Sequence, residues 1–298
     1  MNIWRDGPEP PYSKTINSRW KMVLESMRID WIEHRPYISF FFGFIYVIIG
    51  YFIAGFFFDD TSIAMLFLAT LLIVPSLIKL IEVEEKRESR YGLKHFFREH
   101  RDILEAYVFL FVGVFAGYAL LGFFAHDFNS IFQFQLDFLM NQQGLSQELV
   151  DRFFEGEITA SLSHVAGVLE NNLMVMLICF VLSLFYGVGA IFLITLNASV
   201  FASFIVYVSD YIAKEIGHVF LITGLFMIHM VPEIAGFLIA AIAGGVLSKA
   251  LVGERWKSER FRNVFKDSLM LLVIACALVL AAAFLEVYVT AYLFHGLV

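Results

Sequence analysis

The chain has 298 residues, of which 59% are hydrophobic and only 16% are charged, and its mean hydropathy is +0.75. This composition excludes an ordinary soluble domain, in which about half of the residues are apolar and about a quarter are charged. The net charge of −7 says nothing about nucleic acid, because most of the imbalance lies in one loop. From the composition we expect an all-α, polytopic membrane protein that contacts lipid and binds no nucleic acid.

Taken in chain order, the apolar runs predict about seven membrane-spanning helices, since each needs roughly 20 apolar residues. The run 172–208 is too long for one crossing at about 1.5 Å per residue, so it is expected to form a hairpin that turns near Gly187–Gly189; a broken helix is the alternative. The expected crossings are 38–58, 63–81, 103–124, 171–189, 190–209, 230–251 and 268–292.

Basic residues predict how these helices are oriented. Nineteen of the 21 Lys and Arg residues lie before residue 37, within 79–101 or within 249–266. The positive-inside rule places these three regions in the cytoplasm. The N-terminus is then cytoplasmic and the C-terminus extracytoplasmic, in a multi-pass protein of the cell membrane. The polar first 36 residues do not resemble a cleavable signal peptide.

The chain divides into three parts. Residues 1–36 form a cytoplasmic segment with tryptophans at helical spacing, typical of an amphipathic helix at the membrane surface. Residues 37–101 form a two-helix extension with a basic loop, and 102–298 form a transmembrane core. The core carries an acidic outer loop, 125–170, rich in aromatic residues and expected to form short amphipathic helices. This loop is interpreted either as a lid over helix ends or as a docking surface for envelope proteins.

The most informative segment is Val219–Gly253, an apolar run that contains His229, Pro232 and Glu233. A carboxylate inside the bilayer costs a few kcal/mol on insertion scales, so it normally faces protein or water. Pro232 is expected at the first position of a helix, with Glu233 in its first turn near the positive end of the helix dipole. This interpretation leaves a broken or re-entrant segment near 219–232. On a continuous helix, His229 and Glu233 would be neighbours.

Other polar and small residues in the apolar runs complete the candidate site. The predicted intramembrane polar cluster comprises Asn171, Asn172, Asn197, His229, Glu233 and Glu286. Its role is left open between a network that fixes helix register, an ion pathway and a ligand or partner site. Small residues at helical spacing predict close helix packing, and these are Gly113, Gly117, Gly236, Ala240 and Gly244.

Enzymatic activity is not expected. The chain contains no H-E-x-x-H metal motif, no G-x-S-x-G nucleophile motif and no phosphate-binding glycine loop. Cys179 and Cys276 both lie in apolar runs and are interpreted as small hydrophobic residues. We therefore predict no catalytic residue, no metal site and no cofactor.

A series of polar motifs resembles the stage II sporulation protein M family over roughly residues 103–295. The motifs are Glu170-Asn171-Asn172, Asn197 followed by small residues, H-x-x-P-E at 229–233 followed by A-A-I-A-G-G, and Glu286 in the last span. Asn197-Ala198 stands where the family usually has N-G, and His229-Met230 where it usually has H-G. The resemblance implies a membrane component that works with partner proteins at the cell envelope, similar to a scaffold for peptidoglycan-remodelling enzymes.

Two functional hypotheses follow. The first is a non-enzymatic scaffold that recruits envelope proteins through the acidic outer loop. The alternative is a channel or secondary transporter that uses the buried His, Glu and Asn residues. Whether the protein forms a homo-oligomer is left open.

Overall fold

The computed structural model describes residues 35–91, 101–124, 128–142, 161–185, 189–212, 216–253 and 258–295. All regular structure in these ranges is helical, which confirms the expected all-α class. The amphipathic segment predicted at the N-terminus lies outside the described residues, as does the stretch 143–160 of the acidic loop.

The helices are long and largely apolar. Six of those described are long and apolar enough to cross a membrane, and a shorter apolar stretch, Thr61–Leu77, corresponds to the second predicted crossing. The run 172–208 is divided between two helices, one that ends at Phe185 and one that begins at Gly189, as the hairpin interpretation expects. The helices are α2 (Ile38–Phe57), α3 (Thr61–Tyr91), α5 (Arg101–Phe124), α6 (Phe128–Gln142), α8 (Leu162–Phe185), α9 (Gly189–Ile212), α10 (Ile216–Gly253) and α11 (Glu259–Phe284), which continues into the π-helix η2 (Leu285–Thr290) and α12 (Ala291–His295).

Polar residues just before three helices fix where those helices begin. The Asp60 carboxylate accepts a hydrogen bond from the main-chain N–H of Ile63 at 3.2 Å. The hydroxyls of Ser161 and Ser258 accept from His164 N–H at 3.3 Å and Phe261 N–H at 3.1 Å. Each cap satisfies a donor that the first helical turn leaves without a partner.

The cap at Ser161 explains one difference from the predicted boundaries. The fourth crossing was expected to begin at Asn171, but α8 begins at Leu162. The intervening residues are mostly apolar, and Glu170 points to the exposed side of the helix. Asn171 and Asn172 therefore lie within a helix rather than at its start.

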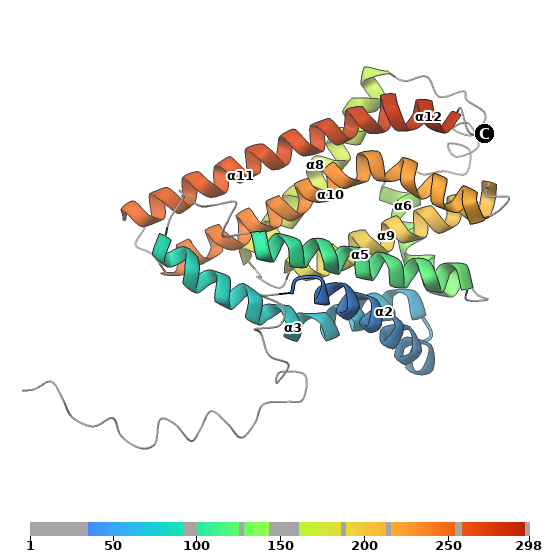
Figure 1. Ribbon diagram of the computed structural model, residues 1–298, viewed down its shortest axis with the longest axis horizontal. Coiled ribbons are helices and arrows are strands. Elements are labelled where there is room, and N and C mark those ends of the chain that lie inside the picture. The colour runs from blue at the N-terminus through green and yellow to red at the C-terminus, as the bar shows by residue number, and fades with distance from the viewer. Residues whose placement is uncertain are drawn as a thin grey trace, which may run out of the picture.

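The second difference concerns α10. Pro232 does not begin a helix but lies inside α10, which is continuous from Ile216 to Gly253. The expected broken or re-entrant segment near 219–232 is therefore wrong. A proline inside a helix removes one hydrogen bond and bends the helix without ending it when the surroundings hold both halves. Figure 1 shows α10 curving along its length.

The helices pack as a bundle with two principal sets of contacts (Figure 1). On one side, α2 packs against α3 and α5, and α5 packs against α9. On the other side, α10 packs against α8 and α11. The largest apolar cluster joins the first set to α10, whereas a second cluster links α8, α9, α10 and α11. Helix α10 thus lies between both halves of the bundle.

Helix α6 is an amphipathic helix in the acidic loop, as predicted, and it packs into the bundle against α3 and α9. Its apolar face buries Ile131, Phe132 and Leu139. Gln135, on the same side, is fully buried and donates a hydrogen bond to the Ser199 hydroxyl at 3.3 Å. This part of the loop is therefore anchored deep in the bundle.

Candidate intramembrane His–Glu–Glu site

The site begins with two polar residues that are one turn apart on α10. Because α10 is continuous, His229 and Glu233 lie on one face of it, as residues at this spacing do. Both side chains are only 6% exposed. The sequence placed them in an apolar run, and the structure turns them towards protein rather than towards the surrounding lipid.

A π-helix brings the third residue into place. The main-chain N–H of Ala291 bonds to the carbonyl of Glu286, five residues earlier, which is the π-helical pattern. This turn contains one residue more than an α-helical turn would, so it changes which side chains share a face. Such turns are rare and occur frequently at functional sites. Here Glu286 and Thr290 both lie in η2.

The three side chains meet between α10 and η2. One ligand atom each from His229, Glu233 and Glu286 lies within 4.8 Å of the other two. The Nδ1 atom of His229 also forms a 2.9 Å hydrogen bond with the Thr290 hydroxyl, which is 61 residues away in the sequence. Thr290 is 1% exposed, so this bond is inside the protein.

Thr290 was missed in the sequence analysis, and no sequence signal identifies it. Threonine is common in apolar helices, where its hydroxyl usually bonds to its own main chain, as Thr70 and Thr195 do here. Its position relative to Glu286 depends on the extra residue of the π-helical turn.

The surroundings of the three residues are apolar. The Phe226 ring contacts the imidazole of His229 edge to face, with ring centroids 5.8 Å apart. Val165, Ala283 and Val287 form a small buried cluster beside η2. In such low-dielectric surroundings the interaction between charges is strong, so two ionised carboxylates this close would repel each other. A positive charge between them would remove that repulsion.

The predicted asparagines lie in two other places. Asn172 is buried on α8, and its side-chain oxygen accepts a 3.3 Å hydrogen bond from the Asn171 amide. Asn197, on α9, donates to the carbonyl of Leu193 in its own helix at 2.9 Å. No hydrogen bond joins these amides to His229, Glu233 or Glu286 among the residues described.

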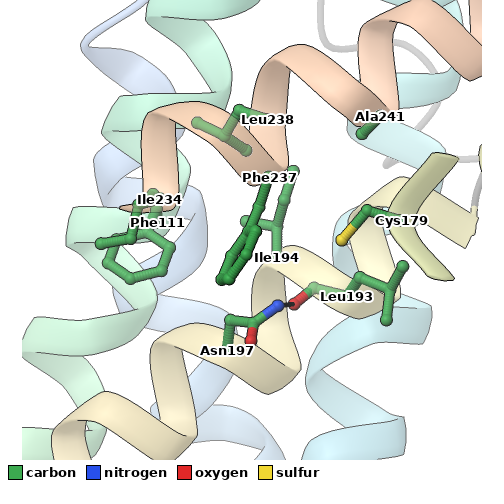
Figure 2. A pocket seen from close by; sticks show the side chains of 9 residues that line it. All are labelled: Phe111, Cys179, Leu193, Ile194, Asn197, Ile234, Phe237, Leu238 and Ala241. Carbon is green, nitrogen blue, oxygen red and sulfur yellow. Dashed lines mark hydrogen bonds between the residues drawn. The ribbon is translucent and has the colours of Figure 1, made fainter. Parts of the chain in front are cut away.

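Asn197 lines a small cavity between α5, α8, α9 and α10 (Figure 2). Its volume is about 10 Å³, near the lower limit for one water molecule. All other lining side chains are apolar or the thiol of Cys179. Figure 2 shows the Asn197 amide beside Phe237, with its nitrogen directed to Leu193. The cavity is therefore a packing defect with one polar group, too small for a substrate.

The small residues lie where helices approach closely. A side chain at Gly113 would overlap the main-chain carbonyl of Phe40, so the first glycine pair packs α5 against α2. On α10, a methyl group at Gly236 would come within 2.7 Å of Val279 on α11. One at Gly244 would overlap the carbonyl of Phe180 on α8. Ala240, between these two glycines, is fully buried. This small face lets α8 and α11 hold α10 tightly.

A comparison with protein families identifies this chain. The family model described as stage II sporulation protein M matches residues 106–291. The chain belongs to this family. No curated protein and no solved structure matches it significantly.

The extent of the family match agrees with the resemblance seen in the sequence. The matched residues begin within α5 and end at the start of α12, so α2 and α3 precede them. His229, Glu233, Glu286 and Thr290 all lie within the part shared with the stage II sporulation protein M family. Together with the apolar helices, this membership makes the chain an integral membrane protein.

Proposed function

We propose that this protein is a non-enzymatic membrane transporter that binds a cation between α10 and η2. The observation that carries the proposal is the meeting of His229, Glu233 and Glu286 within 4.8 Å in an apolar interior. Ionisable residues inside a membrane are costly, and they commonly mark ion pathways. A network that only fixed helix register would work as well with neutral amides, without two carboxylates side by side.

The helices that hold the site support movement as well as binding. Helix α10 carries Pro232 between the two ligands, and the last span carries the π-helical turn that holds the third. Both features interrupt the regular i to i−4 hydrogen bonding of a helix, and bends concentrate at such points. His229 and Glu233 are buried and Glu286 is half-buried, so a shift of these helices would open the site, and transporters use motions of this type.

The orientation expected from the basic residues completes the proposal. With residues before 37, 79–101 and 249–266 in the cytoplasm, the N-terminus is cytoplasmic. The helices then alternate so that α10 runs inward and the last span runs outward.

Ion flux into liposomes tests the proposal. The purified protein is reconstituted, and uptake of H⁺, K⁺, Na⁺ and Zn²⁺ is followed with fluorescent indicators. We expect wild-type protein to carry a cation and Glu233→Gln to lose at least about 90% of that flux, because the substitution removes a charge that holds the ion. Glu170→Gln, an exposed carboxylate on α8, is the matched control and should retain it. No flux from folded wild type contradicts transport, and equal flux in both variants contradicts transport through Glu233.

A scaffold is the second candidate, and helix α6 favours it. Its buried face fixes it to the bundle, while Gln133 and Asp137, one turn apart, remain exposed. A partner could therefore recognise a surface that is held in a defined position. Photo-crosslinking from position 133 in the native membrane tests this candidate. A specific envelope protein captured there, combined with absent flux, would favour the scaffold over the transporter.

A further inference from the structure

We infer that the ion bound at this site is a divalent transition-metal ion, held by the Nε2 atom of His229 and the carboxylates of Glu233 and Glu286. The inference rests on the proposed function, because it names the class of ion that the transporter would take. It also differs from the expectation of no metal site. That expectation rests on the absence of a two-histidine motif such as H-E-x-x-H, whereas the ligands here are one histidine and two glutamates from two helical segments.

The distances suit a single small ion. A tetrahedral ion with bonds of about 2.0–2.2 Å has ligand atoms roughly 3.4 Å apart. One ring nitrogen of His229 and one oxygen of each glutamate already lie within 4.8 Å of one another, so small rotations of these side chains close the difference. Glu233 is 6% exposed and receives no hydrogen bond from any residue described. Its buried carboxylate is therefore available for a ligand.

Thr290 orients the imidazole. Since its hydroxyl bonds to Nδ1 of His229, Nε2 is the ring nitrogen left for the metal. Metal-binding histidines almost always have their second nitrogen held by such a partner, which fixes the tautomer and the ring direction. Because the histidine and the threonine lie on different helices, this bond also ties the ligand set together.

Charge and donor chemistry select the class of metal. Two carboxylates balance the charge of a divalent ion, whereas a monovalent ion would leave one buried negative charge. Imidazole nitrogen combined with carboxylate oxygen suits zinc, iron or manganese, while magnesium and calcium prefer oxygen ligands alone. The soft thiolate sites that bind Cu(I) are excluded at this place, because Cys179 packs in another cluster and Cys276 is exposed.

Equilibrium binding of Zn²⁺ and Mn²⁺ tests the inference on the full chain, stripped with chelator and reconstituted in nanodiscs. We expect one ion per chain, with affinity lowered at least about 100-fold in Glu233→Gln and in Glu286→Gln. Glu170→Gln should bind as wild type does. Thr290→Val should weaken binding about 10–100-fold, and Thr290→Ser should restore it, since serine keeps the hydroxyl. Size-exclusion profiles and thermal unfolding confirm that each variant is folded.

The outcomes separate this inference from the proposed function. Zn²⁺ or Mn²⁺ binding that depends on Glu233, without flux in liposomes, supports the metal site and contradicts the transport proposal. Flux of H⁺, Na⁺ or K⁺ that depends on Glu233, without metal binding, keeps transport and overturns the metal site. Metal binding that is equal in Glu233→Gln and wild type also overturns it, because the ion is then held elsewhere.

Discussion

Gly244 and Gly245 show that the surroundings of a glycine determine whether a side chain can replace it. They are neighbours in the chain and both lie in α10. A methyl group at Gly244 would overlap the main chain of Phe180, whereas one at Gly245 would meet nothing within 4 Å. The first glycine is therefore required for α10 to approach α8, and the second is not.

This difference predicts opposite effects of the same substitution. Gly244→Ala should lower stability by about 1–3 kcal/mol, because backbone must move to admit the methyl group. Gly245→Ala should leave stability unchanged or raise it by up to about 1 kcal/mol through its better helix propensity. Thermal unfolding in one detergent measures the stability of both variants, and each variant is the control for the other. If Gly244→Ala were tolerated as well as Gly245→Ala, α10 and α8 would be farther apart than described.

Helix α10 combines packing contacts, two of the proposed ligands and an internal proline. It packs against α8 and α11, carries two of the three acidic or imidazole ligands, and contains Pro232 between them. Its 38 residues would extend about 57 Å if straight, nearly twice the hydrocarbon thickness of about 30 Å. Its bend therefore matters for how it fits in a bilayer.

The distance between its two ends tests the bend. Spin labels at Phe220 and Val252, both highly exposed, would be about 48 Å apart on a straight helix, apart from the reach of the labels. Wild-type protein, with Cys179 and Cys276 replaced, should give a shorter distance by pulsed electron resonance. Pro232→Ala should lengthen it by restoring the missing N–H. Gly224→Ala, which leaves the hydrogen bonding intact, is the control. A wild-type distance equal to that of Pro232→Ala would exclude a proline-induced bend.

The sequence predicted much of the site but not its geometry. The spacing made His229 and Glu233 neighbours only on a continuous helix, which Pro232 left undecided, and an unusual carboxylate in an apolar run identified Glu286. Whether Pro232 begins a helix or bends one could not be decided, because both are compatible with its fixed φ and missing N–H. The π-helical turn has no pattern of its own in the sequence, so Thr290 was not predicted. The separation of Asn197 from the ligands depends on how α9 rotates in the bundle.

At the scale of the whole molecule, the number of crossings depends on α3. Its apolar stretch Thr61–Leu77 covers 17 positions, or about 25 Å, slightly less than the hydrocarbon core. If α3 spans the membrane, the described helices make seven crossings and the two termini are expected on opposite sides. If it does not, they lie on the same side.

Labelling of the termini shows directly whether they lie on opposite sides of the membrane. A single cysteine is placed at residue 2 or residue 297 in a chain that lacks Cys179 and Cys276. A membrane-impermeant maleimide should label residue 297 on intact cells, and should label residue 2 only after the membrane is opened. Labelling of both positions on intact cells, or of neither, would mean that α3 does not cross.

The His229–Thr290 bond also has a consequence for biogenesis. Because these residues are 61 positions apart, α10 leaves the ribosome well before η2 does. Its imidazole and carboxylate must therefore enter the bilayer without Glu286 or Thr290, at a cost of a few kcal/mol on insertion scales. The small face of α10 can already pack against α8, which is made earlier. Membrane insertion of α10 thus relies on helices already in place, and the last span completes the site only after its own synthesis.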